Sequence, residues 1–441
     1  MTEGLAARQF STAASAVAIP FALIGGCVRR LSSGPRRALA LAVVLGFVGV
    51  GATSAFADSA DTSTARYIVT FASGVSAAEQ TADVAAAGAS DVSSIPELHM
   101  RAVDASDAAV ATLTSSVDVV RVEADGVRQV QATPGDPEYA QQWSLSRIGW
   151  DQVFGSVYPA GSATVAVLDT GVDASHPDLA GQVVPGTSVL DPSSDGTTDP
   201  NGHGTWMAGI VAAATDNGLG IAGIGYAGVR VLPVTVLGSD GTGRDSDIVS
   251  GVTYAADHGA DVILMAFSNP GYSGALQAAV DYAWSKGAVV VAATGNDSSS
   301  IPTFPAGDRG VMGVSSTDYW DALDLSSNYG ADTFLAAPGA GIETTAAGGG
   351  YATISGTSAA AAEVAGAAAL LKASSVDATN GVVVGRLARN ADAVGTFDQT
   401  GNGRLNLARA IWDTSTNSVE PAGSPPYGQR GRPRSIRGGR K

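Results

Sequence analysis

The sequence predicts an α/β fold, with a doubly wound and mainly parallel sheet, preceded by a small α+β domain. Short runs rich in β-branched apolar residues alternate with stretches of helical periodicity. The runs lack the polar alternation of a half-exposed strand, so helices should cover both faces of the sheet. The predicted strands are 163–169, 229–237, 260–267, 288–294, 310–316 and 333–338, and the predicted helices are 203–214, 245–258, 273–286 and 358–372.

The small domain is predicted between residues 66 and 131. In chain order it should form a strand, a helix, a strand, a helix and closing strands, at 66–71, 76–89, 99–105, 107–116 and 119–130. With the linker that precedes it, this part of the chain covers residues 58–133. The main domain is expected at 134–412.

Composition excludes several functional classes. The chain has 441 residues, of which 45% are hydrophobic and 15% charged, and its formal net charge is −16. A nucleic-acid partner is not expected, because phosphate binding needs a cationic surface. The single cysteine, Cys27, lies in the N-terminal targeting region. We therefore expect no disulfide, thiolate nucleophile or cysteine metal site in the mature protein.

The first 57 residues are predicted to direct export. Arginine pairs at 29–30 and 36–37 precede the apolar run 38–50, and a small-x-small cleavage site follows at 55–57. The run is shorter than the ~20 residues needed to span a bilayer, so a cleaved signal peptide is favoured over a membrane anchor. A second apolar run precedes the arginines, and we therefore expect translation to start at Val28.

The C-terminal residues 413–441 are predicted to be a disordered basic tail. From Glu420 onward the sequence is rich in proline, glycine and arginine and lacks an apolar pattern. Two interpretations stay open, a dispensable solvated tail and a segment that touches an acidic surface.

Four polar residues occur where predicted strands end or predicted helices begin. Asp169 ends one buried strand and Asn296 follows another, whereas His203 and Ser358 each stand at the start of a helix. The carboxyl ends of parallel strands share one edge of a sheet, so these side chains could converge. Together they would supply an orienting acid, an oxyanion donor, a base and a nucleophile for acyl transfer.

Each of these residues also has a purely structural interpretation. Asp169 and Asn296 are common turn residues, and histidines such as His203 are more often structural than catalytic. Ser358, in the stretch SGTSAAAAEVAG, is a favoured helix N-cap residue. Capping and nucleophilic roles of Ser358 are compatible, because a helix start provides both a cap position and backbone donors.

The segments that carry these residues resemble, in order, the sequence blocks of subtilases, which are subtilisin-like serine endopeptidases. They are VAVLDTGVDASHPDL, NGHGTWMAGIVAA, VVVAATGND and YATISGTSAAAAEVAG. The resemblance extends over residues 134–412. The small N-terminal domain is similar to the inhibitor-type propeptide of the family, through its YIVTF and VVRVEADGVRQ segments.

The resemblance implies a role for each residue. Ser358 would be the nucleophile, His203 its general base and then the acid for the leaving amine, and Asp169 the group that orients the imidazole. Asn296 and the backbone N–H of Ser358 would form the oxyanion hole. The propeptide would assist folding, occupy the cleft and be removed by self-cleavage.

Several positions depart from the family pattern. Trp206 follows the His-Gly-Thr motif where a histidine is common, and Ala359 and Ala362 replace a methionine and a proline after the nucleophile. The substrate-binding strand usually ends in two glycines. Here its last residues are Phe267, Ser268 and Asn269, so an atypical substrate pocket is expected.

The family often binds calcium, and Asp178 with Asn217 matches one such site in outline. Carboxylate, amide and carbonyl oxygens are suitable calcium ligands. A plain polar loop is the alternative interpretation of these residues. No cofactor is expected for the chemistry itself, so calcium would be a structural ion.

The predicted function is therefore that of a secreted serine endopeptidase acting on proteins or peptides, with its own propeptide as an intramolecular inhibitor. We expect a monomer with no stable membrane span and no nucleic-acid partner. Two alternatives to this function remain. An aspartic peptidase would need a second Asp-Thr-Gly or Asp-Ser-Gly besides LDTG at 168–171, and none occurs. The second alternative is a catalytically silent binding protein of subtilase fold.

Overall fold

The computed structural model describes residues 64–126 and 132–424, which form two compact units divided between Gly126 and Val127. The predicted export region, with Cys27, the expected start at Val28 and the cleavage site, lies outside the described residues. Residues 127–131 and 425–441 lie outside them as well.

The N-terminal unit is a four-stranded antiparallel sheet with two helices, in the order βαββαβ. The sheet order is β2-β3-β1-β4, and its core contains Val69, Val103 and Leu113. Strand β2 was not predicted, because its sequence SDVSSI is polar and all its residues are exposed. The elements are β1 Ala65–Phe71, α1 Ala77–Ala86, β2 Ser90–Ile95, β3 Met100–Ala105, α2 Asp107–Ser115 and β4 Val119–Ala124.

The C-terminal unit is built on a seven-stranded sheet in which every pairing is parallel, with the order β11-β10-β9-β8-β5-β7-β6. The prediction of a mainly parallel α/β sheet is confirmed. The strands are β5 Ala163–Asp169, β6 Thr187–Ser188, β7 Val229–Thr235, β8 Val262–Met265, β9 Val289–Ala293, β10 Val311–Thr317 and β11 Leu335–Pro338. A separate antiparallel hairpin, β12 Ile342–Ala346 and β13 Gly350–Ile354, precedes the helix that carries Ser358.

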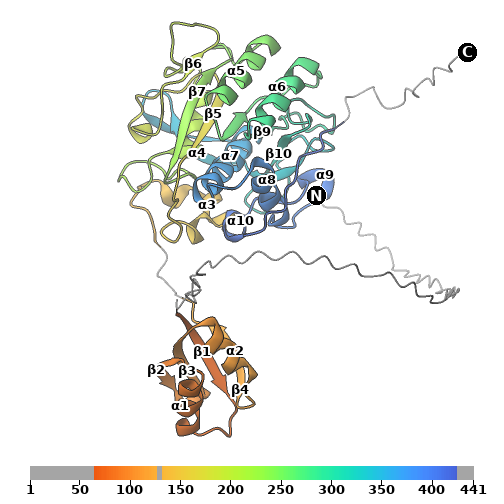
Figure 1. Cartoon of the computed structure of the whole chain (residues 1–441). Coiled ribbons are helices and arrows are strands. Elements are labelled where there is room, and N and C mark those ends of the chain that lie inside the picture. The colour runs from red at the N-terminus through yellow and green to blue at the C-terminus, as the bar shows by residue number, and fades with distance from the viewer. Residues whose placement is uncertain (1–63, 127–131, 425–441) are drawn as a thin grey trace, which may run out of the picture. The chain divides into compact units, whose positions relative to one another are not determined.

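Helices cover both faces of this sheet (Figure 1). Along β5, Val165 and Val167 pack into the core layer of α4 and α7, whereas Ala166 and Leu168 pack into that of α5 and α6. This alternation follows from the twofold repeat of a strand. The helices are α3 Trp143–Arg147, α4 His203–Ala212, α5 Asp245–Asp257, α6 Gly274–Ser285, α7 Thr357–Ser374, α8 Asn380–Arg389, α9 Phe397–Thr400 and α10 Leu407–Trp412.

Helix α7 is the central helix of the unit and packs against α4 and six strands of the sheet. Ala359, Ala360, Ala361 and Ala362 are all 0% exposed, and small side chains at these positions let the helix approach its neighbours closely.

Within residues 64–126 and 132–424, no helix has the length and apolar character needed to cross a membrane.

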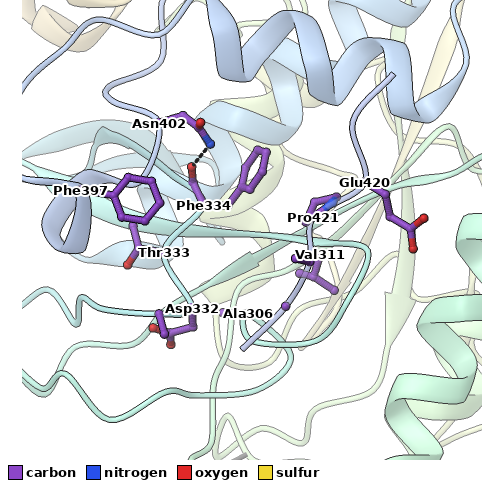
Figure 2. A pocket seen from close by; sticks show the side chains of 12 residues that line it. Ala306, Val311, Asp332, Thr333, Phe334, Phe397, Asn402, Glu420 and Pro421 are labelled. Carbon is purple, nitrogen blue, oxygen red and sulfur yellow. Dashed lines mark hydrogen bonds between the residues drawn. The ribbon is translucent and has the colours of Figure 1, made fainter. Parts of the chain in front are cut away.

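Residues 413–424 pack onto the C-terminal unit, which corrects the expected start of the tail at residue 413. Val419 N–H donates to Gly381 O at 2.9 Å, and Gly310 N–H donates to Pro421 O at 2.9 Å. Residues 420–423 also line a pocket with Asp332, Phe334 and Phe397 (Figure 2). The composition did not reveal this packing, because it depends on backbone hydrogen bonds. The pocket contains none of the four candidate catalytic side chains.

Candidate active site

The turn after β5 places a buried carboxylate at the edge of the sheet. Asp169, the last residue of the strand, is 0% exposed. Two residues later Gly171 has a φ of +115°, and a Cβ atom there would lie 2.0 Å from the carbonyl oxygen of Thr198. Only glycine fits this turn. The chain can therefore fold back tightly beneath the loop that leads into α4.

Helix α4 begins at His203, directly beside that turn. The preceding Gly202 has a φ of +102°, and a Cβ atom on the following Gly204 would lie 2.0 Å from Gly171 O. The two glycines thus permit close approach of helix and turn. As a result, His203 Nδ1 lies 2.8 Å from Oδ1 and 2.9 Å from Oδ2 of Asp169.

The pKa of His203 is raised above its ordinary value by this arrangement. Burial alone would lower the pKa, but the charge of Asp169, its hydrogen bond to the ring and the charge of Asp199 outweigh burial. The carboxylate next to Nδ1 favours the tautomer that leaves Nε2 free to accept a proton. The pair has the arrangement of an orienting acid and a general base.

Asp199 is a site residue that the sequence analysis missed. Its carboxylate accepts from Thr170 Oγ1 at 2.8 Å, from Gly202 N at 2.8 Å and from the N–H of Thr205 at 2.8 Å. One side chain thus joins the β5 turn to the first turn of α4, and so fixes Asp169 relative to His203. The available signal was a carboxylate four residues before His203, where it can satisfy open N–H groups at a helix start.

Ser358 is not the N-cap of its helix. That position belongs to Gly356, which has a φ of +141°, and Ser358 is the second residue of α7. The expectation that Ser358 also caps the helix is therefore wrong. No non-glycine residue readily adopts this φ. Thr357 and Ala359 are 0% exposed, whereas Ser358 between them is half-buried and accessible to a substrate.

The Ser358 hydroxyl donates to Ala266 O, just past the end of β8, at 2.9 Å. Strand β8 pairs with β5, which carries Asp169, and α4 packs against α7. The nucleophile and base candidates therefore start neighbouring helices at one edge of the sheet. Within the described ranges, no hydrogen bond joins Ser358 Oγ to His203. Catalytic hydrogen bonds of this kind often tighten only when substrate binds.

Asn296 follows β9 and contacts the start of α7. Its Oδ1 accepts from the N–H of Thr357 at 2.9 Å and from Thr357 Oγ1 at 3.0 Å. Because Oδ1 is occupied by these donors, the Nδ2 group is directed elsewhere. A Cβ atom on Gly356 would lie 3.0 Å from Nδ2. The amide donors therefore lie beside the loop that leads into Ser358, where an oxyanion donor is required.

The three predicted substrate-binding residues lie directly after Ala266, which contacts the nucleophile candidate. Phe267 is half-buried against the core layer of α5 and α6, whereas Ser268 and Asn269 are exposed. Asn269 pairs with Phe304 through two backbone hydrogen bonds, of 2.9 and 2.7 Å. Ser268 Oγ lies so close to Gly295 that a Cβ there would be 2.7 Å away. Ser268 therefore narrows the space between these two segments.

The residues that depart from the family pattern fit their surroundings. The Trp206 ring lies edge-on to His203, with ring centroids 5.7 Å apart. It shields one side of the imidazole from water. Ala359 and Ala362 are fully buried in the α7 packing described above.

Asp178 and Asn217, the predicted cation ligands, are brought together by the fold. Asp178 is 0% exposed and accepts from Asn217 Nδ2 at 2.8 Å and from Ile221 N at 2.9 Å. Asp136, distant in sequence, accepts from the N–H of Asn217 at 3.0 Å. Burial raises the pKa of both carboxyl groups, and the charge of Asp178 also raises the pKa of Asp136.

Comparisons with known proteins identify the family to which this chain is similar. A family model described as Subtilase family matches residues 161–410. Thermitase from Thermoactinomyces vulgaris is 40% identical over 285 residues, which are 63% of this chain and 99% of thermitase. Subtilisin BL from Lederbergia lenta is 35% identical over 268 residues, 61% of this chain and 97% of that protein. A solved protease structure from Pseudoalteromonas arctica PAMC 21717 aligns with a TM-score of 0.60 and 31% identity, covering 64% of this chain and 99% of that one.

The fold and the site define the class of protein, an α/β hydrolytic enzyme of the serine type. The chain belongs to the Subtilase family. It is a subtilisin-like serine endopeptidase, and the family needs no cofactor for catalysis. This assignment removes the aspartic-peptidase alternative, and none of the comparisons favours a catalytically silent protein.

Proposed function

We propose that the chain is a secreted serine endopeptidase in which Asp169, His203 and Ser358 form the catalytic triad and Asn296 donates to the oxyanion. The observation that carries this proposal is the contact of His203 Nδ1 with both carboxylate oxygens of Asp169, at 2.8 and 2.9 Å. This contact between His203 and Asp169 lies at the same edge of the sheet as the half-buried Ser358, at the start of α7.

The residues support an acyl-enzyme mechanism. Ser358 Oγ attacks the scissile carbonyl while its proton moves to Nε2 of His203, and Asp169 stabilises the imidazolium that results. The backbone N–H of Ser358 and the amide of Asn296 stabilise the negative oxygen of the tetrahedral intermediate. The imidazolium then gives its proton to the leaving amine, and water hydrolyses the acyl-enzyme by the reverse sequence of proton transfers.

We propose further that residues 1–57 are an export signal and that residues 58–133 are a propeptide. The apolar run 38–50 with its flanking arginines supports export. The compact βαββαβ unit with its own core supports a separately folding propeptide. It would inhibit the enzyme until self-cleavage between residues 132 and 137. The mature enzyme would act as a monomer on protein and peptide substrates.

Calcium is proposed as a structural ion near Asp178. Asp178 and Asp136 are buried carboxylates whose pKa values are raised by burial. A cation between them would offset the free-energy cost of burying two ionised carboxylates. Nearby backbone carbonyls, with the Asn217 amide turned so that its oxygen and not its Nδ2 group faces Asp178, would complete an all-oxygen set, which suits calcium. In the ranges 64–126 and 132–424, no three His, Cys, Asp or Glu side chains form a metal cluster, so carbonyl and amide oxygens would be required.

Propeptide release tests this proposal on the full chain. Wild type, Ser358→Ala and the control Ser285→Ala, on the exposed end of α6, would be expressed in parallel. Wild type and the control should release the segment that ends between residues 132 and 137, and Ser358→Ala should accumulate as the precursor. Processing of Ser358→Ala in a purified preparation would show that Ser358 is not the nucleophile. A wild type that stays unprocessed would refute self-cleavage.

A further inference from the structure

The pocket in Figure 2 lies at the edge of the sheet opposite the candidate active site. Val311 begins β10, and residues 331–334 directly precede β11, so the pocket is formed where these two strands start. Candidate catalytic residues occur instead where strands end, because Asp169 ends β5 and Asn296 follows β9. In a parallel sheet the starts and the ends of the strands lie at opposite edges. The pocket is therefore separate from the site at which a peptide would be cleaved.

The pocket is a cavity of about 350 Å³, which is within the size range of sites for small organic groups. Residues 420–423, which belong to the segment after α10, form one of its walls. Gly310 N–H donates to Pro421 O at 2.9 Å, and Ser424 N–H donates to Gly307 O at 2.8 Å. This wall is thus fixed to the loop before β10, and the cavity is preformed.

One side of the pocket contains a buried carboxylate with an unused oxygen atom. Asp332 is 3% exposed, and its Oδ2 accepts from the N–H of Thr303 at 2.8 Å and from Thr303 Oγ1 at 3.2 Å. Its Oδ1 is buried and has no hydrogen-bond partner within residues 64–126 and 132–424, and the same holds for Oγ1 of the next residue, Thr333. Buried polar atoms almost always have a partner, so two such atoms at one cavity indicate a site for a bound donor.

Two aromatic rings also line the pocket. Phe334 is half-buried, and Phe397, the first residue of α9, is 73% exposed (Figure 2). Asn402 Nδ2 donates to Phe334 O at 2.9 Å and so holds the backbone beside the ring. The face of an aromatic ring carries partial negative charge and attracts cations. The rings therefore favour a flat cationic group in the cavity.

The charge of the pocket favours a cation as well. Its twelve lining residues include two carboxylates, Asp332 and Glu420, and no lysine, arginine or histidine. Glu420 lies 3.6 Å from Arg309, whereas Asp332 has no ion-pair partner in the part of the chain that the structure describes. Burial raises the pKa of Asp332 to about 6, so its carboxyl group is ionised at neutral and alkaline pH. A bound cation would offset the cost of burying this charge.

An arginine side chain fits these features better than a water molecule or a metal ion. Its planar guanidinium stacks on aromatic rings and has several N–H donors, enough for Asp332 Oδ1 and Thr333 Oγ1 together. A water molecule would leave the charge unbalanced. A calcium ion takes roughly six to eight oxygen ligands, and phenyl rings supply none. Across the two described ranges, moreover, no three His, Cys, Asp or Glu side chains form a metal cluster.

We propose that this pocket binds the guanidinium of an arginine side chain, with its charge balanced by Asp332 and its plane against Phe397. The inference goes beyond the proposed function and does not rest on it, because the pocket contains none of the candidate catalytic side chains. Two sources carry this chemistry. One is another polypeptide, and the other is the chain itself, since residues 425–441 directly follow the pocket wall in sequence and include five arginines.

Calorimetric titration at about pH 8, where Asp332 is ionised, tests the proposal. The probes are N-acetyl-argininamide and N-acetyl-citrullinamide, which has nearly the same shape and no charge. The protein is the full chain with Ser358→Ala, which prevents self-cleavage, and a form of it that ends at Ser424 and keeps every described residue.

Two variants and one control are compared in the shortened form. Asp332→Asn keeps an oxygen that can accept from Thr303 and removes the charge. Phe397→Ala removes a ring that is mostly exposed, so folding should not depend on it. The matched control is Asp398→Asn, because Asp398 is an exposed carboxylate beside Phe397 that does not line the pocket.

In the shortened form, N-acetyl-argininamide should bind at least about tenfold more tightly than N-acetyl-citrullinamide. Asp332→Asn should weaken its binding about tenfold and Phe397→Ala about threefold, whereas Asp398→Asn should match its parent. Equal binding of the two probes, or an unchanged affinity in either pocket variant, would overturn the proposal. Weaker binding to the full chain than to the shortened form would identify residues 425–441 as the source of the arginine, and equal binding would identify another polypeptide.

Discussion

Glu363 provides a quantitative test of how α7 is packed. It lies five residues after Ser358 on the same helix and is 0% exposed. Burial raises the pKa of its carboxyl group to about 8, although the nearby Ser144 hydroxyl and the charge of Arg404 act in the opposite direction. The folded protein therefore holds this side chain as a neutral acid at neutral pH.

The sign of the pH dependence follows from linkage. The folded state keeps the proton up to a pH near 8, whereas the unfolded chain releases it near the ordinary pKa of 4.5. The stability due to this group is fully present below pH 4.5 and is lost as the pH rises through the folded-state pKa. Each pH unit between the two values costs about 1.4 kcal/mol, and the whole interval costs about 5 kcal/mol.

Glu363→Gln keeps the shape of the side chain and removes the ionisation. The variant should therefore become more stable relative to its parent as pH rises, with a difference that grows by about 1.4 kcal/mol per unit up to the folded-state pKa and then levels off. Urea unfolding from pH 5 to 9, in a Ser358→Ala background that prevents autolysis, measures this difference. Any cost in free energy of unfolding that comes from burying the new amide does not change with pH. Such a cost shifts the difference between variant and parent by a constant and leaves its slope unchanged.

Glu420→Gln is the matched control, because the Glu420 side chain is 49% exposed. Its stability difference should stay flat over the same range. A flat difference for Glu363→Gln as well would refute the reasoning, since it would mean that Glu363 ionises equally in the folded and unfolded states.

Three further predictions concern the site. Asp199→Asn removes a charge that raises the pKa of His203, so the acidic limb of the kcat/KM profile should move to lower pH, whereas an unmoved limb would contradict that coupling. Asn296→Ala should lower kcat about 100- to 1,000-fold with little change in KM, and a change confined to KM would exclude an oxyanion role. Asp178→Asn, measured by calorimetry with and without added calcium, should abolish most of the calcium-dependent rise in Tm, and an unchanged rise would place the ion elsewhere.

Much of the candidate site could be predicted from the sequence, for a physical reason. Asp169 and Asn296 follow buried strands, and His203 and Ser358 start helices, so the geometry of a parallel sheet brings them to one edge. The prediction that Ser358 caps the helix failed because Gly356 occupies the N-cap position. Its φ of +141° moves the N-cap away from Ser358, and a propensity for serine at N-caps cannot reveal a backbone angle.

Other features depend on contacts that local patterns do not encode. Asp199 supports the site through hydrogen bonds to residues on both sides of it in sequence, and its loop has no periodicity. Asp136 joins Asn217 only because the fold brings distant loops together. The polar edge strand Ser90–Ile95 lacks an apolar face, so its partner strand specifies it. Residues 413–424 pack through backbone hydrogen bonds, which residue composition does not predict.

Covalent labelling tests the central claim most directly. The processed wild-type protein would be treated with a fluorophosphonate, digested and analysed by mass spectrometry, beside His203→Ala and the control Ser285→Ala. We predict one adduct, on Ser358, in wild type and the control, and strongly reduced labelling in His203→Ala, because the base activates the hydroxyl. An adduct on another serine, or active protein that carries no adduct at Ser358, would contradict the assignment of Ser358 as the nucleophile.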